Sequence, residues 1–118
     1  MDTSPEYIKQ CEKAGEIQRG KHFPVTMGQR IIFWENDIFA QINLLSTNWK
    51  IVWLPRQDQL QEMIRETESN SLIEICRLYK FVMNNISLMN LSMEQLWLSF
   101  VMSKKYGKSF DGNEWIRK

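Results

Sequence analysis

The chain has 118 residues, of which 43% are hydrophobic and 25% charged, a composition typical of globular proteins rather than of disordered, collagen-like or disulfide-rich ones. Fifteen Lys and Arg residues against fourteen Asp and Glu give a formal net charge of +1, so the overall charge indicates no polyanionic partner. The length favours a single domain over residues 1–118, large enough to form a hydrophobic core without metal ions or disulfides.

We expect neither secretion nor membrane insertion from this sequence. The first residues contain no basic segment followed by an apolar stretch, and the longest nearly apolar run, residues 96–102, is too short to cross a bilayer. Cys11 and Cys76 are therefore expected to stay reduced, and the apolar neighbours of Cys76 predict that its side chain lies in the core. We expect a cytoplasmic protein without a membrane partner.

The N-terminal segment carries a helix-start signal, since Ser4 is a good capping residue and Pro5 suits the first helical turn. Apolar residues then recur at intervals of three and four as far as Ile17, and the helix is expected to end around residues 19–20. Because the apolar stripe is narrow and the other positions are mostly polar, we expect this helix to lie on the outside of the fold.

Residues 21–54 are rich in residues that favour strands. Residues 29–34 and 38–44 are predicted to form a hairpin around the polar turn 35–37, and residues 49–53 a third strand after a turn at 46–48. Trp49, Ile51 and Trp53 alternate with Lys50 and Val52 in this third strand. The alternation predicts that Trp49 and Trp53 lie on a buried face that packs against the helices.

From Arg56 onwards the pattern is helical. A short amphipathic helix carries Leu60 and Ile64, and capping boxes at residues 71–74 and 92–95 begin two longer helices. Gly107 is expected to end the last of them, before a turn that returns Trp115 to the core. The predicted fold class is α+β: an N-terminal helix, a small antiparallel sheet of about three strands, and then three helices packed on it.

Residues suited to catalysis or cofactor binding are nearly absent. His22 is the only histidine, and the five glycines are dispersed rather than gathered in a phosphate-binding loop. The carboxylate pairs at helical spacing have basic and amide neighbours, which is typical of a solvated surface. We expect a protein that is not an enzyme and that binds no cofactor or metal ion.

Two kinds of macromolecular binding remain open. A face that combines Trp34, Trp49 and Trp53 with Arg30 and Lys50 would stack single-stranded bases and contact phosphates, and a basic C-terminal end would extend it. Protein binding is indicated by seven methionines and by residues 81–89, which carry apolar side chains on more than one side of their helix. That surplus predicts either a central position in the fold or a homodimer contact.

Three segments resemble a group of small uncharacterised proteins that are encoded by bacterial phages and prophages. They are WLPRQDQLQEM at residues 53–63, MEQLWLSFVM at 93–102 with its continuation to Trp115, and the opening residues 6–14. The middle strands are not part of the resemblance. It implies an accessory protein in the cytoplasm of a bacterial host, and it implies no reaction, cofactor or catalytic residue.

In the first of these segments, Arg56, Gln57 and Asp58 follow the helix-stopping Pro55. Polar residues at this position are expected to fix the start of a helix through side-chain hydrogen bonds. We predict that these three residues form a binding site for another macromolecule. The predicted partner is a host or phage protein or a second copy of the chain, with single-stranded nucleic acid as the alternative.

Overall fold

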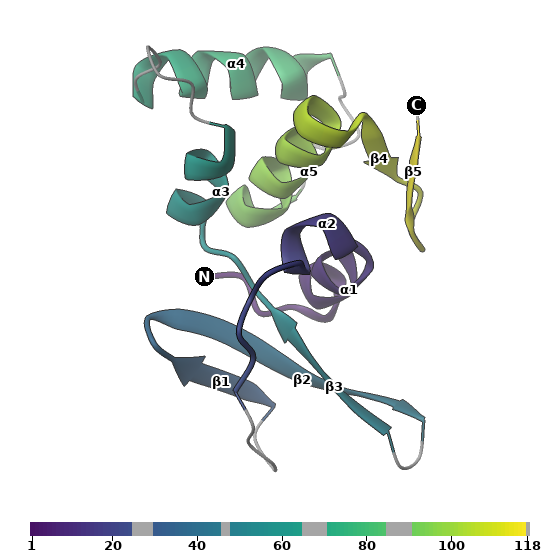
Figure 1. Ribbon diagram of the computed structural model, residues 1–118. Coiled ribbons are helices and arrows are strands. Elements are labelled where there is room, and N and C mark those ends of the chain that lie inside the picture. Colours follow the sequence, from purple (N-terminus) through teal and green to yellow (C-terminus); the bar gives the residue numbers. More distant parts are fainter. Residues whose placement is uncertain (25–29, 46–47, 65–70, 85–90, 118) are drawn as a thin grey trace.

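The three-stranded sheet lies on one side of the molecule and the helices are stacked above one of its faces (Figure 1). The computed structural model describes residues 1–24, 30–45, 48–64, 71–84 and 91–117. The helices are α1 (Pro5–Lys13), α2 (Gly15–Gln18), α3 (Gln57–Ile64), α4 (Ser71–Met83) and α5 (Met93–Tyr106). The strands are β1 (Ile31–Trp34), β2 (Asp37–Leu45), β3 (Asn48–Trp53), β4 (Lys108–Phe110) and β5 (Trp115–Arg117). The predicted α+β fold class is confirmed.

Helix α1 lies between the sheet and α5, so the expectation of an outer helix is wrong (Figure 1). The side chains of Tyr7 and Cys11 are fully buried, and even Gln10 is largely covered. The helix is covered on more than one side although its apolar stripe is narrow, because its neighbours cover polar positions such as Gln10 as well. The side chains of α1 thus join the sheet and α5 in one hydrophobic core, whose largest members include Trp97 and Phe100.

The predicted N-terminal helix is interrupted at Ala14, which has a non-helical backbone with φ −90° and ψ 70°. Beyond this break, the Gln18 side chain reaches the outer edge of β3. Its oxygen accepts a hydrogen bond from the Trp53 N–H, and its Nε2 donates to the Trp53 carbonyl oxygen, each at 2.8 Å. Gln18 therefore satisfies both backbone groups of an edge residue, as a neighbouring strand would.

The helix-end signals are confirmed at α1 and α5. Ser4 Oγ accepts a hydrogen bond from the Tyr7 N–H at 3.3 Å. Ser92 and Gln95 form the reciprocal bonds of a capping box, and Gly107 ends α5 in the left-handed conformation with φ 64°. The side chains of the predicted capping box at residues 71–74 lie outside the described part of the structure.

The sheet has the strand order β1-β2-β3, with both pairs antiparallel. Ile38, Ala40 and Val52 face the helices and belong to the main core. The opposite face carries a second cluster of Ile32, Phe39 and Trp53. Trp53 is buried at 4% exposure, as expected, but the prediction that its face packs on the helices is wrong, because Val52 occupies that face. The side chain of Trp49 lies outside the described residues.

The C-terminal tail forms a feature that the sequence did not predict, a two-stranded sheet of β4 and β5. The expected return of Trp115 to the core is confirmed: its ring is buried, and its Nε1 donates a 2.9 Å hydrogen bond to the carbonyl oxygen of Gln10.

Cys76 is exposed on α4, so its predicted core position is wrong, whereas Cys11 is buried. Residues 85–89 of the predicted apolar segment 81–89 lie outside the described residues, and Met83 in its described part is exposed.

Candidate functional site

A tight turn joins β1 to β2 at the tip of the hairpin. Trp34 pairs with Asp37, which leaves Glu35 and Asn36 as a two-residue loop. Both loop residues have positive φ, 49° for Glu35 and 66° for Asn36. Two consecutive left-handed residues are typical of a type I′ turn, whose twist matches that of the flanking strands. The turn therefore presents its backbone carbonyls in a defined direction.

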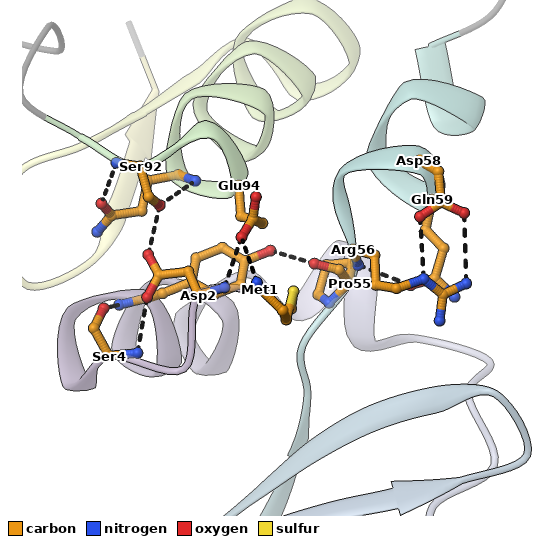
Figure 2. Close-up of polar contacts among 11 residues, drawn as sticks. Met1, Asp2, Ser4, Pro55, Arg56, Asp58, Gln59, Ser92 and Glu94 are labelled. Atoms are coloured by element: carbon orange, nitrogen blue, oxygen red, sulfur yellow. Dashed lines mark hydrogen bonds and ion pairs between the residues drawn. The ribbon is translucent and has the colours of Figure 1, made fainter.

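Arg56 connects this turn to the start of α3. Its carbonyl oxygen accepts the first helical hydrogen bond, from the N–H of Leu60, so Arg56 occupies the capping position of the helix. Its guanidinium donates to the carbonyl oxygen of Asn36 through Nη1. It also faces both carboxylate oxygens of Asp58, with Nε–Oδ1 at 3.1 Å and Nη2–Oδ2 at 3.5 Å (Figure 2). The forked contact fixes the direction of the guanidinium.

The structure brings together two of the three residues of the predicted polar cluster. Arg56 and Asp58 interact, but Gln57 is half-buried at the start of α3 and takes no part in this set of bonds. Gln59, rather than Gln57, helps to fix the start of the helix, because its Oε1 accepts a 2.8 Å hydrogen bond from the N–H of Arg56. The three-residue offset between these two positions is that of half a capping box, which is the signal that would have identified Gln59.

Asp37 links the hairpin to two other parts of the chain. Its Oδ1 accepts a 2.6 Å hydrogen bond from Gln59 Nε2, and its Oδ2 lies 3.0 Å from Lys21 Nζ. Burial alone would raise the pKa of Asp37, but the hydrogen bonds from Lys21 and Gln59 outweigh it and hold the pKa below its usual value. The Lys21 ammonium also lies 4.0 Å from the ring centroid of Trp53. These contacts anchor the turn to the rest of the molecule.

Two aromatic side chains are exposed beside this polar set. Phe33 is 76% exposed and Trp34 is 37% exposed, and both belong to the edge strand β1. The ring of Trp34 lies 6.4 Å from that of Phe39, so its orientation is supported by the buried cluster on that face. Phe33 was missed from the sequence, although successive side chains of a strand point to opposite faces and a hairpin sheet can leave part of one face in solvent.

A hollow of about 350 Å³ brings these groups together. It is lined by the hairpin residues 33–38 and by Arg56. We call Phe33, Trp34, the turn residues Glu35 to Asp37 and Arg56 the hairpin-tip site. Trp34 and Arg56 came from two separate sequence predictions, and the structure places them at one site.

The other residues of the predicted nucleic-acid face do not gather with Trp34. Trp53 is buried, and its backbone groups are bonded to Gln18. Arg30 and Lys50 are exposed and lie beyond the other end of β1, near α1. Lys50 Nζ lies 3.6 Å from a carboxylate oxygen of Glu12. In the described part of the structure, the expected row of exposed tryptophans flanked by cations is not present at the hairpin tip.

The hairpin-tip site is held from behind by the core. The hydroxyl of Tyr7 donates a 2.6 Å hydrogen bond to the carbonyl oxygen of Pro55, directly before Arg56. A second set of bonds lies beside it: Asp2 accepts from the Ser92 hydroxyl and from the Ser4 N–H, while its own N–H donates to Glu94 (Figure 2). In Figure 2 the Asp2 set lies on one side of Pro55, and the bonds between Arg56 and Asp58 lie on the other. The position of Arg56 is therefore fixed by contacts on both sides.

Among the described residues, no three His, Cys, Asp or Glu side chains come close enough to hold a metal ion. In the same part of the chain, no helix combines the length and the apolar character needed to cross a bilayer. What the site offers is exposed aromatic surface beside a rigidly held guanidinium.

Comparison of the chain with protein-family models, with curated proteins and with solved structures found no match. The resemblance to phage and prophage proteins stays a prediction from the three sequence segments.

Proposed function

We propose that the protein acts without catalysis, as a phage- or prophage-type accessory protein that binds another protein through the hairpin-tip site. The observation that carries this proposal is the 76% exposure of Phe33, held on a short strand at the edge of the sheet. Full burial of such a side chain is worth about 1.5–3 kcal/mol, and here that burial is left for a partner. Aromatic residues and Arg are the types most enriched at the energetic centres of protein interfaces.

Local charge favours a protein partner over a nucleic acid. The site and its immediate ion-pair partners contain two cations and three carboxylates, namely Lys21, Arg56, Glu35, Asp37 and Asp58. Nucleic-acid binding sites need an excess of cations to replace the counterions of the phosphates. Of the two members of the predicted base-stacking set whose side chains are described, Trp34 is exposed and Trp53 is buried, and Trp34 lies beside this acidic excess.

The edge of β1 indicates how a partner would bind. The N–H of Gln41 donates to the Arg30 carbonyl, and in an antiparallel pair the bonded residues alternate. The backbone groups of Ile31 and Phe33 therefore point away from β2. No described strand pairs with this edge, whereas Gln18 covers the corresponding groups of Trp53 on β3. An extended segment of the partner would add to β1 and place a side chain against Phe33.

A pull-down from bacterial lysate tests the proposal, with the lysate divided into nuclease-treated and untreated halves. The parent chain is compared with Phe33→Ser and Arg56→Ala, and Tyr79→Ser serves as the matched control because Tyr79 is an exposed aromatic on α4. We expect a protein that is retained in both halves by the parent and by the Tyr79 variant, and lost with the Phe33 and Arg56 variants.

Three outcomes would contradict the proposal. Captured material that disappears after nuclease treatment would favour the nucleic-acid alternative. Equal retention by all four chains would move the contact away from the hairpin tip. If light scattering gave twice the 14.2 kDa chain mass for the parent and a single mass for Phe33→Ser, the site would be a homodimer contact instead.

A further inference from the structure

A second hollow, separate from the hairpin-tip site, lies between α1 and the sheet at the opposite end of β1. Its volume is about 300 Å³, at the lower end of the range for ligand pockets. Ile8 of α1, Ile42 of β2 and Pro5 supply apolar lining. Ile8 is itself buried, so this apolar surface is a fixed part of the core. The hollow suits one apolar side chain rather than a whole small molecule.

Cations surround this apolar surface. Lys9, Lys13 and Arg30 line the hollow, and Lys50 lies beside it through its contact with Glu12. The one carboxylate that lines the hollow belongs to Glu12, which is 3.8 Å from Lys13 Nζ and 3.6 Å from Lys50 Nζ. Together with Asp111, which interacts with Lys9, these described residues leave a local excess of two positive charges in a chain whose net charge is +1. Charge of one sign concentrated around an apolar surface favours a ligand of the opposite sign.

These cations form only weak ion pairs within the described part of the molecule. Both contacts of Glu12 are longer than the 2.7–2.9 Å or so of a strong charged hydrogen bond. Lys9 donates a 3.0 Å hydrogen bond to Asn113 and also interacts with the carboxylate of Asp111, so the positive charge that the hollow offers comes from Lys13, Arg30 and Lys50. Arg30 is exposed and has no carboxylate partner among the described residues, and residues 25–29 before it carry no charge. The positive charge is thus available to a partner.

We propose that this hollow is a docking site for a short acidic peptide segment of a partner protein. An apolar side chain of the segment packs over Ile8 and Ile42, and flanking carboxylates contact Lys13 and Arg30. A nucleic acid fits less well, because the described lining contains no aromatic ring for base stacking and Glu12 would face the phosphates. This inference does not depend on the function proposed for the hairpin tip.

Fluorescence anisotropy with labelled peptides tests the proposal on the full chain. The probe is acetyl-Glu-Leu-Glu-Glu-Leu-Glu-amide, compared with one peptide that has Lys in place of every Glu and another that has Ser in place of every Leu. The protein variants are Arg30→Glu and Lys13→Glu, with Arg117→Glu as the matched control on the exposed part of β5. All three positions are exposed, so the variants are expected to fold like the parent.

We expect the acidic peptide with leucines to bind, and its affinity to fall when the salt concentration rises. Each of the two charge reversals at the hollow should weaken binding roughly tenfold, while Arg117→Glu should not. Both comparison peptides should bind more weakly. The proposal is overturned if the acidic peptide does not bind, if the serine peptide binds equally well, or if Arg30→Glu and Lys13→Glu bind like the control. Tighter binding of a labelled single-stranded oligonucleotide at these same residues would also overturn it.

Discussion

The hydroxyl of Tyr7 and the carbonyl oxygen of Pro55 form a 2.6 Å hydrogen bond inside the core. This bond joins the N-terminal helix to the short segment between β3 and α3. Arg56 follows Pro55 directly, and on its other side it donates to the Asn36 carbonyl of the hairpin turn. A buried tyrosine thus holds the backbone directly before the residue whose guanidinium belongs to the hairpin-tip site.

Tyr7→Phe should lower the free energy of unfolding by about 1–3 kcal/mol, because the Pro55 carbonyl would lose its buried donor. Urea denaturation measures the change, and Tyr79→Phe is the matched control since Tyr79 is exposed. A Tyr7→Phe chain as stable as the parent would show that the bond adds nothing to the net stability.

Glu35→Asn should raise the free energy of unfolding by about 0.5–1 kcal/mol. Glu35 is held at φ 49°, and Asn tolerates the left-handed region better than Glu does. Asn36→Ala is the opposing control, because Ala at φ 66° should destabilise the same turn. Thermal or urea unfolding of the two variants should move in opposite directions, and a shift of both in one direction would contradict the turn assignment.

Asp37→Asn should remove a pH-dependent part of the stability. The pKa of Asp37 lies below its ordinary value of 3.8, so its contribution is present above that value and is lost as the pH falls through the lower folded value. The difference in unfolding free energy between parent and variant should therefore be constant near neutral pH and shrink below about pH 4. Denaturation curves over a pH series measure it, and a difference independent of pH would contradict the assignment.

One of the two thiols should react quickly with a soluble thiol reagent. Cys76 is exposed, whereas Cys11 is buried and its pKa is raised by that burial. We expect one equivalent of rapid labelling in the native parent and none in Cys76→Ser, with Cys11 reacting after the chain is unfolded in urea. Rapid labelling of native Cys76→Ser would contradict the position of α1 in the core.

Local signals predicted the elements well. Ser4, Gly107 and the Ser92–Gln95 capping box act through contacts a few residues away, so their effects can be read directly from the chain. The return of Trp115 was also predicted, although strand β4 and strand β5, which begins at Trp115, were not. Strands of three residues are too short to give a clear alternation pattern.

The wrong predictions concern which neighbour covers a given face. Alternation placed Trp53 and Val52 on opposite faces correctly but could not tell which face meets the helices, because both are buried. Helix α1 was assigned to the surface since its apolar stripe is narrow, yet the sheet and α5 enclose it. At the candidate site, Arg56 and Trp34 were predicted separately, and only the tertiary structure places them together.

The most direct test of the hairpin-tip site is photo-crosslinking in bacterial cells. A photoreactive phenylalanine analogue replaces Phe33 in one chain and Tyr79 in a control chain. We expect a crosslinked protein at position 33 that resists nuclease treatment and is absent at position 79. Crosslinks to nucleic acid, equal crosslinking at both positions, or no crosslink at position 33 would contradict protein binding at the hairpin tip.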